Sequence, residues 1–324
     1  MDPLSDVLSL LKPRSYMCGG FDVGGELSVE FGRHEGIKCY ALVSGECWLA
    51  VESVPDAVHL KAGDCFLLPR GLPFRLASDL TATPTDALTF AARARNGSIV
   101  TINGGGDGLI LGGHFALEGS HAAMLLGVLP PIVHIRSEED KAELRWCLER
   151  MRQEIGEERP GAVLVAQQLA YMMLVQALRL HLEEGLRGGV GWLFALANQQ
   201  MNAAISSMHS DPAYRWTLQE LAERAGMSRS IFAVKFRELV GTSPMEYLTR
   251  WRMMLAGDRL KNTDDPVSTI ALSLGYESES AFSKAFKRVM GCSPRQYSRG
   301  CKASSAPRAH EEDALFDRHE LVAV

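Results

Sequence analysis

The sequence predicts a multidomain α+β chain in which a strand-rich β-barrel or sandwich precedes a helical C-terminal half. Three observations predict this fold class. Short β-type runs broken by Gly, Pro and Asp fill residues 36–135, helical patterns follow from residue 137, and residues 221–247 and 270–297 are two copies of one pattern. A chain of 324 residues is also long enough for two hydrophobic cores.

The N-terminal part is expected to be an all-β barrel or sandwich, because many short strands at close spacing are typical of those architectures. Turn residues separate the apolar runs from one another. The expected strands are residues 37–43, 47–51, 65–68, 74–77, 87–91, 98–102 and 109–115.

Two long helices are expected after the strands. Ser137 and the acidic residues behind it suit a helix start, and Leu144, Leu148, Met151 and Ile155 then recur at helical spacing. A second helix, rich in Leu, Met and Ala, is expected over residues 162–184.

A flexible linker is expected next, because residues 185–191 are rich in Gly. A helix over residues 192–209 should then lead into the repeat. After the repeat, residues 301–324 are polar and are expected to be a disordered tail.

The repeat in the C-terminal half reads twice as helix, Gly turn, helix. In each copy an apolar residue and Ala precede a Gly, and two Phe a helical turn apart precede Gly-x-Ser-Pro-x-x-Tyr. The copies are offset by 49 residues before the turn and by 50 after it, which a turn of variable length tolerates. The matched positions are Leu221/Ile270, Ala222/Ala271, Gly226/Gly275, Phe232/Phe282, Phe236/Phe286, Gly241/Gly291, Ser243/Ser293, Pro244/Pro294 and Tyr247/Tyr297.

Local signals place the ends of the repeated helices. Thr217 and Ser228 are expected to cap the two helices of the first copy, and Ser268 the first helix of the second. Gly226 and Gly275 should end the first helix of each copy, because Gly takes a positive φ at little steric cost. The second helices then bury the apolar stripes Phe232–Phe236–Val240 and Phe282–Phe286–Met290.

Two short helices joined by a Gly turn form a helix-turn-helix, whose second helix can lie in the major groove of DNA. Helix pairs of this kind also occur in bundles and solenoids, but solenoids need three or more repeats and this chain has two. Charge favours the DNA-binding interpretation. The chain carries a net charge of −5, whereas residues 211–300 hold 14 Lys and Arg against 10 Asp and Glu. Neutralising phosphates requires such a local excess of positive charge.

Four segments of the repeat carry a family resemblance: Gly-Met-Ser-Arg-Ser at 226–230, Gly-Tyr-Glu-Ser-Glu-Ser at 275–280, Phe-Ser-Lys-Ala-Phe-Lys-Arg at 282–288 and Gly-Cys-Ser-Pro-Arg-Gln-Tyr at 291–297. With them, residues 211–299 resemble the DNA-binding domain of AraC/XylS transcription regulators. The resemblance implies that a central helix, here Pro244 to about Asn262, joins two helix-turn-helix motifs. It also implies that their second helices enter successive major grooves on one face of the duplex.

Helical geometry and the resemblance together indicate which residues contact DNA. The expected base contacts are Ser230, Ala233, Val234, Ser280, Ser283 and Lys284. The expected phosphate contacts are Ser228, Arg229, Lys235, Arg237, Ser278, Lys287 and Arg288. Because Ala233 and Val234 can touch a thymine methyl but cannot form a bidentate hydrogen-bond pair, the second copy is expected to read sequence more sharply.

The strand-rich part carries a motif of its own. Residues 63–74 fit the pattern Gly-x5-Pro-x-Gly-x2-His at every place but the last, where Phe74 stands. This pattern is the cupin motif, and residues 1–205 resemble the cupin-type sensory domain found on one branch of AraC-like regulators. The resemblance implies a cupin-like β-barrel of the jelly-roll type. The strand that carries metal-binding histidines in cupin enzymes corresponds to residues 36–45, which contain none. Because neither Phe74 nor Tyr40 supplies a nitrogen ligand, we expect no metal and no cofactor.

The resemblance implies that the cupin-like domain detects a small-molecule effector. The aromatic candidates for its pocket are Tyr40, Trp48, Phe66 and Phe74. An alternative is a metal-dependent cupin enzyme fused to a DNA-binding module, which would draw its ligands from the unassigned histidines. These are His34, His59, His114, His121 and His134.

Seven cysteines, an odd number without regular spacing, indicate reduced thiols rather than disulfides. Cys18 leaves a redox-sensing regulator open as a second alternative, since the resemblance implies a cysteine near there. Its usual partner position holds Gly112, and an inert buried thiol is the other interpretation. A third alternative, a DNA-repair sensor with a cysteine-bound zinc, is disfavoured because no Cys-x2–4-Cys pair exists.

Taken together, these features predict a DNA-binding transcription regulator, an activator and not an enzyme. Its expected partners are double-stranded DNA, a small-molecule effector, RNA polymerase and a second copy of the chain. The lack of eighteen consecutive apolar residues and of a signal-like N-terminus predicts a cytoplasmic protein without membrane contact. The expected domains are a cupin-like sensory domain (1–135), a helical dimerisation and linker region (136–190), a connecting helix (191–210), the double helix-turn-helix domain (211–300) and the tail (301–324).

Overall fold

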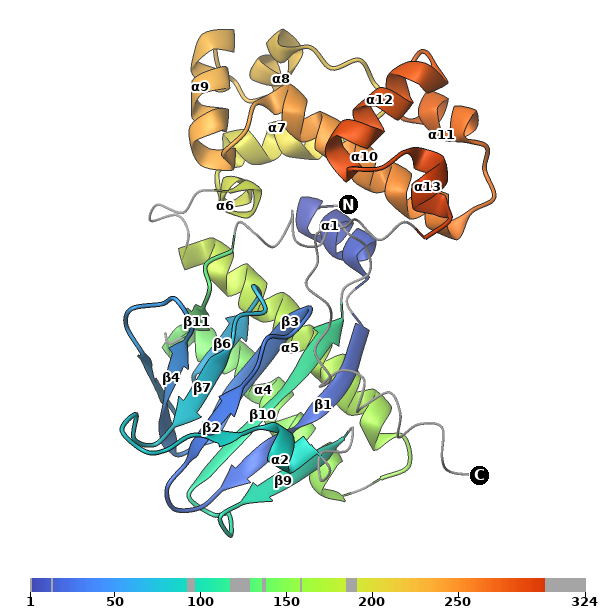
Figure 1. Ribbon diagram of the computed structural model, residues 1–324. Helices are drawn as coiled ribbons and strands as arrows, with labels where there is room; N and C mark the ends of the chain where they lie inside the picture. The colour runs from blue at the N-terminus through green and yellow to red at the C-terminus, as the bar shows by residue number, and fades with distance from the viewer. Residues whose placement is uncertain are drawn as a thin grey trace. The chain divides into compact units, whose positions relative to one another are not determined.

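The computed structural model describes residues 2–12, 14–91, 97–116, 129–135, 138–157, 159–184 and 191–300. These residues form two compact units (Figure 1). The β-rich unit takes the described residues between 14 and 116 and between 129 and 181, and the helical unit takes residues 2–12 and those from 182 to 300. Residues 185–190 of the predicted linker, the tail at 301–324 and His121 lie outside the described residues.

The β-rich unit contains two sheets, as expected for a jelly-roll-like domain. Neighbouring strands are antiparallel except for the pairs β1–β9 and β2–β8. The six-stranded sheet has the order β11 (Val133–Ile135), β6 (Cys65–Leu68), β3 (Ile37–Ser44), β10 (Gly108–Ala116), β1 (Arg14–Val23), β9 (Ser98–Ile102). The five-stranded sheet has the order β5 (Val58–Lys61), β4 (Glu46–Val51), β7 (Phe74–Ala77), β2 (Ser28–Phe31), β8 (Thr85–Asp86).

One hydrophobic core lies between the two sheets. Strand β4 shows how alternation builds it, because Cys47, Leu49 and Val51 are buried in this core while Glu46 and Trp48 face outward. Strand β3 differs, since its first six residues are all buried. A strand that is buried on both faces needs a second layer of cover.

Two long helices of the β-rich unit supply that cover. They are α4 (Glu138–Glu157) and α5 (Ala162–Glu184), which follow the predicted ranges closely. Gly113 of β10 brings the sheet close to Ala170 of α5, and the Cys18 Sγ atom lies 3.9 Å from the carbonyl oxygen of Val163. By length and composition, residues 162–182 would also suit a membrane-spanning helix. In this unit, however, Ala166, Ala170 and Met173 of α5 are buried, and Ala170 lies against the six-stranded sheet.

One predicted strand of the β-rich unit is wrong. Residues 87–91 contain a helical turn, α2 (Leu88–Ala91), instead of a strand. The backbone N–H of Leu88 donates to the Asp86 carboxylate at 2.9 Å, and the Thr89 hydroxyl donates to the Asp86 carbonyl at 2.7 Å. Such local side-chain bonds stabilise a helix start and compete with strand pairing.

The helical unit contains the repeat and the helices that support it. Its elements are α1 (Pro3–Leu11), α6 (Trp192–Ala197), α7 (Gln199–Ser210), α8 (Leu218–Arg224), α9 (Arg229–Val240), α10 (Pro244–Asn262), α11 (Val267–Ser273), α12 (Glu279–Met290) and α13 (Pro294–Ser298). The helix predicted over 192–209 is divided at Asn198, whose side chain accepts from the N–H groups of Gln200 and Met201 at 3.1 Å and so caps α7.

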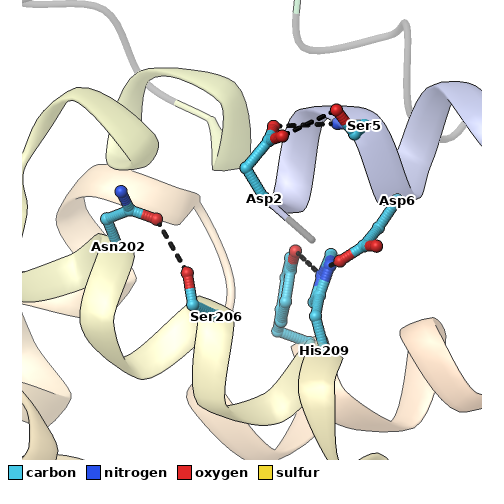
Figure 2. A network of polar contacts seen from close by, with 7 residues as sticks. Asp2, Ser5, Asp6, Asn202, Ser206 and His209 are labelled. Carbon is cyan, nitrogen blue, oxygen red and sulfur yellow. Dashed lines mark hydrogen bonds and ion pairs between the residues drawn. The ribbon is translucent and has the colours of Figure 1, made fainter.

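The first helix of the chain, α1, belongs to the helical unit and not to the β-rich unit to which residues 1–135 were assigned from the sequence. Asp2 caps it by accepting from the Ser5 N–H at 3.0 Å, as Figure 2 shows. Its apolar side is buried, and Lys12 at its end pairs with Asp258 of α10 at 2.7 Å. The N-terminus thus completes the core of a unit encoded some 180 residues later.

A buried histidine joins α1 to this unit. His209 of α7 has its Nδ1 atom 3.3 Å from the Asp6 carboxylate (Figure 2). Its Nε2 atom lies 2.9 Å from the Tyr247 hydroxyl. Its ring stacks on Trp251 with centroids 3.8 Å apart. Burial lowers the pKa of His209 to about 3. The neutral ring satisfies both contacts when Nδ1 carries the proton, since it then donates to Asp6 and accepts from Tyr247.

Candidate nucleic-acid interface

The first copy of the repeat forms a helix-turn-helix with the predicted caps. Thr217 and Glu220 form a reciprocal capping box at the start of α8, and Gly226 turns the chain at φ 63°. The Ser228 hydroxyl then accepts from the Ile231 N–H at 3.4 Å and begins α9. Gly241 ends α9 in the left-handed region at φ 80°.

The second copy repeats this design with one change. The structure places the N-terminal cap of α11 at Pro266 and not at the predicted Ser268, so the helix begins two residues earlier without a side-chain cap. Ser278 caps α12 by accepting from the Ala281 N–H at 3.2 Å. Gly275 has φ 79°, and a Cβ atom there would overlap the carbonyl oxygen of Ala213. Only Gly therefore fits this turn.

Equivalent aromatic clusters hold α9 and α12, the second helices of the two motifs, which are called the recognition helices below. In the first copy the rings of Phe232 and Phe236 lie 5.5 Å apart, and that of Tyr247 lies 5.8 Å from Phe236. In the second copy the corresponding distances are 5.6 Å and 5.3 Å, within the cluster Phe282–Phe286–Tyr297. All four Phe side chains are fully buried, so the opposite side of each recognition helix is free to face a ligand.

The exposed side of α9 carries most of the residues that were predicted to contact DNA. Ser228, Arg229, Ser230, Val234, Lys235 and Arg237 are exposed, and Ala233 is half-buried. Ile231, which the sequence reasoning did not select, is 53% exposed and lies beside Val234. Counting at about 100° per residue from the Phe stripe would have placed it on the outward side.

The exposed side of α12 is polar and basic. Ser278, Ser280, Lys284, Lys287 and Arg288 are exposed, and Ser283 is half-buried. Arg288 also lies 3.6 Å from the Glu246 carboxylate of α10. The two recognition helices therefore share a fold but differ in chemistry, because Lys284 occupies the position that Val234 has in α9.

Arg252 of α10 connects the two motifs. Its guanidinium donates to the carbonyl oxygens of Pro212 at 2.6 Å and Tyr214 at 2.8 Å, which precede the first motif. It also lies 5.7 Å from the ring centroid of Tyr276, in the turn of the second motif. One side chain thus holds parts of both motifs, and Gly275 packs against the same segment at Ala213.

One cleft of the helical unit is lined by residues of α7, α8 and the segment between them, and by none of α9 or α12. It has a volume of about 770 Å³ and lies between α7 and α8. Its lining includes the acidic residues Asp211, Glu220 and Glu223 and the aromatic residues Tyr214 and Trp216. An acidic cleft repels phosphates, so it does not extend the DNA-binding surface.

The predicted effector-pocket residues do not share one pocket. Tyr40, Phe66 and Phe74 belong to the tightly packed core between the sheets. Trp48 is 36% exposed on the outward side of β4, where its ring stacks on His59 at 4.6 Å. The cavity beside Tyr40 has a volume of about 30 Å³, far below the several hundred Å³ of a small-molecule site.

A larger cleft opens at the edge of the same core. Its volume is about 470 Å³, and it lies between β2, the loop at residues 81–85 and Phe90. Its floor is formed by the core residues Val29 and Ile102, and Thr85 and Asn103 lie among its polar walls. Nothing in the local sequence pattern indicated this cleft, because its walls come from segments up to about 77 residues apart.

Phe74, which stands in the histidine position of the cupin motif, lies next to a positive charge. Its ring stacks on Phe31 with centroids 4.4 Å apart, and the Lys38 ammonium lies 5.1 Å from its centroid. Lys38 is buried and would repel a divalent cation at this place. Among the described residues, no group of three or more His, Cys, Asp and Glu side chains is arranged to hold a metal ion.

Cys18 is fully buried on the helix-covered side of β1. Burial raises the pKa of its thiol, so the reactive thiolate is disfavoured. This environment is typical of an inert core cysteine and counts against the redox-sensing alternative.

Two family descriptions match the chain. Residues 2–183 match the family described as Cupin, and residues 221–300 match the family described as Helix-turn-helix domain. The chain is 42% identical over 298 residues to an AraC-like transcription regulator of Streptomyces antibioticus, covering 92% of this chain and 98% of that protein. The chain is also 41% identical over 298 residues to an AraC-like transcription regulator of Streptomyces lividans, again covering 92% of this chain and 98% of that protein.

Among solved structures, the chain is similar to the DNA-binding domain of the global transcriptional factor AdpA in complex with a target DNA. The sequences are 29% identical, and the match covers 32% of this chain and 92% of that one with a TM-score of 0.29.

Proposed function

Since the chain belongs to the AraC-like transcription regulators, we propose that it activates transcription by placing α9 and α12 in successive major grooves of a promoter. The observation that carries this proposal is the pair of equivalent recognition helices, each with a buried Phe stripe and an exposed polar side. One helix-turn-helix reads a few base pairs, and a pair of them held by one central helix reads two adjacent segments.

We assign base contacts to Ser230, Val234, Ser280 and Lys284, because these residues are exposed on the recognition helices. Ala233 and Ser283 are half-buried and contact bases at the margin of each helix. The exposed residues Ser228, Arg229, Lys235, Arg237, Ser278, Lys287 and Arg288 contact phosphates. The caps Ser228 and Ser278 support this assignment, since helix N-termini favour anions.

The experiment that tests this function is a footprint of the full chain on its own upstream DNA. We expect a protected segment of roughly two helical turns per protomer, because two successive major grooves are about 34 Å apart. A random pool of duplexes provides the same test without a known promoter, since a sequence-specific binder enriches one motif. A chain that protects no segment and enriches no motif does not have this function.

The effector is proposed to bind in the β-rich unit at the cleft of about 470 Å³. A volume of several hundred Å³ suits a small metabolite, whereas the packed surroundings of Tyr40, Phe66 and Phe74 leave room for little more than water. The hydroxyl and amide groups of Ser28, Thr85 and Asn103 favour a polar ligand. Thermal-shift screening of metabolites against the full chain would identify it, and a panel without any stabilising compound would count against an effector of this class.

A homodimer and a contact with RNA polymerase complete the proposal. Helix α5 supports the dimer, because Leu164, Val165 and Met172 leave apolar surface exposed on a helix whose other side is buried. An activator acts by recruiting or contacting the polymerase, so transcription in vitro from the protected promoter should rise when the chain is added. Repression in that assay would reverse the proposed direction of control.

We also propose that the cupin domain is not an enzyme. The support is the replacement of a metal-ligand position by Phe74 and the buried ammonium of Lys38 beside it. Stoichiometric iron, manganese or zinc in the purified protein would contradict this part of the proposal.

A further inference from the structure

The outward side of α9 carries two large apolar side chains that have no place in the core. Ile231 is 53% exposed and Val234 is 58% exposed. Being three residues apart, they are surface neighbours with Cβ atoms about 5–6 Å apart. Single exposed apolar residues are common on proteins, but an adjacent β-branched pair on a recognition helix forms a continuous apolar ridge.

This ridge occupies the centre of the helix surface that faces away from the core. At about 100° per residue, Ile231 and Val234 lie on either side of the line opposite the Phe232–Phe236–Val240 stripe. Ser230 flanks the ridge and Ala233 is half-buried at its margin. Glu238, one helical turn after Val234, is exposed on the same side.

The charges around the ridge indicate which class of ligand it contacts. Three exposed cations of the same helix, Arg229, Lys235 and Arg237, outnumber its one acidic residue, the exposed Glu238, and residues 211–300 are basic within an acidic chain. A cationic rim favours a polyanion over an apolar protein surface. On the floor of the major groove, the one apolar group is the C5 methyl of thymine.

We propose that Ile231 and Val234 form a methyl-reading ridge that recognises thymine methyl groups in the half of the DNA site bound by α9. This inference rests on the proposed function. Valine and isoleucine in a helix have one strongly preferred χ1 rotamer, so the ridge is rigid before it binds and loses little entropy on binding. A cytosine at the same place would offer an amino donor that the ridge cannot satisfy.

The second recognition helix provides an internal comparison. Ala281 and Lys284 occupy the positions of Ile231 and Val234, so α12 has no such ridge. The two halves of one DNA site are thus read by different chemistry: methyl contacts in the α9 half and a charged hydrogen-bond donor in the α12 half.

Replacing thymine by deoxyuridine tests the ridge directly, because uracil keeps the hydrogen-bonding edge of thymine and lacks only the methyl. The probe is the duplex that the full chain enriches from a random pool. The half in which Lys284→Ala alters base preference belongs to α12, and the other half belongs to α9. With uracil throughout the α9 half, we expect the Kd to rise about fourfold for each methyl contacted, since burying one methyl-sized group changes affinity by that factor. In the α12 half the change should stay below about twofold.

Two variants show whether the ridge causes this effect. The double variant Ile231→Ala/Val234→Ala should bind the thymine and uracil duplexes equally. Leu272→Ala, which removes an apolar side chain that is 64% exposed on α11, should keep the wild-type ratio.

Three results would overturn the inference. The first is equal binding of both duplexes by the wild-type chain. The second is a double variant that retains the thymine preference. The third is a double variant that loses self-association while its thymine preference stays unchanged, which would assign the ridge to a protein contact. A pool without any enriched sequence would instead overturn the proposed function itself, and with it the DNA ligand of the ridge.

Discussion

Val234 and Lys284 occupy matched positions 50 residues apart, and their side chains offer a base different interactions. Valine presents only methyl groups, whereas the lysine ammonium donates hydrogen bonds and carries a charge. Each side chain is exposed on its own helix, and two Phe residues on the opposite side of that helix are buried. The fold is thus used twice, and single side chains decide what each copy reads.

At this scale we predict different outcomes for two lysines of α12. Lys284→Ala should lose discrimination at one base pair by about 1 to 3 kcal/mol, because Lys284 lies at the centre of the outward surface. Lys287→Ala should weaken binding to all sequences alike and reduce the salt slope by about one, as expected for a phosphate contact. Competition gel shifts on single-base variants of the site, repeated at several salt concentrations, measure both effects.

The two variants serve as controls for each other, since each removes one exposed positive charge from the same helix. A uniform loss of affinity in both would show that Lys284 also contacts only the backbone.

Among the elements, helix α10 determines how the two motifs are arranged. It begins where the first motif ends, and Tyr247 near its start packs on Phe236. Further along, Gly257 leaves space for the ring of Tyr297, which packs on Phe286 of the second motif. A glycine within a helix costs about 1 kcal/mol relative to alanine, and here it allows this close approach. Arg252, between these two places, bonds to the segment before the first motif and lies against Tyr276 of the second.

We therefore predict that Arg252 fixes the spacing of the two halves of the DNA site. The wild-type chain should lose affinity steeply when one base pair is inserted between the halves, because the insertion shifts one half by about 3.4 Å and also rotates it. In Arg252→Ala the motifs lose this connection, so binding to the original site should weaken about tenfold, or roughly 1.4 kcal/mol, and the penalty for insertion should shrink. Gel shifts with zero, one and two inserted base pairs measure it.

Arg250→Ala is the matched control, because Arg250 lies on the same helix and contacts Glu246 of that helix at 3.3 Å. It should retain the wild-type penalty. If Arg252→Ala loses as much affinity on insertion as the wild-type chain does, packing alone, without this arginine, sets the spacing.

For the whole molecule, charge and apolar surface are distributed unevenly between the two units. The chain is acidic overall, and the excess of positive charge is confined to the double motif. In the β-rich unit, α5 buries Ala166, Ala170 and Met173 and exposes Leu164 and Met172, which are 68% and 44% accessible. A monomer gains nothing from this exposed apolar surface, whereas a second copy of the chain would cover it.

We predict that Leu164→Glu/Met172→Glu gives a monomer, because burying two carboxylates in a symmetric interface is unfavourable. Sedimentation velocity of the full chain should show a dimer for the wild type and a monomer for this variant. Binding to a single site of two grooves should persist, since each helical unit carries both motifs. Leu80→Glu is the control, because Leu80 is 38% exposed on a loop of the same unit. A dimer that survives in the α5 variant, or a monomeric wild type, would exclude α5 as the interface.

Features that depend on residues close together in the chain could be predicted from the amino-acid sequence. The Phe pairs, the caps at Thr217 and Ser228 and the turn glycines at 226 and 275 are local signals, and the structure has them as predicted. The range Pro244–Asn262 of the central helix, which the family resemblance implied, agrees with the structure as well. Most short strands were predicted too, because alternation and turn residues mark them.

Features that depend on distant segments could not be predicted in this way and became known from the tertiary structure. It placed α1 in the helical unit through the contacts of Asp6 and Lys12, turned Trp48 outward from the core, and joined the two motifs through Arg252. It also left Ile231 and Val234 exposed side by side, which periodicity suggests but only packing decides. The physical reason is that propensity, capping and periodicity act within a few residues, whereas burial and long-range hydrogen bonds are set by neighbours brought together only when the chain folds.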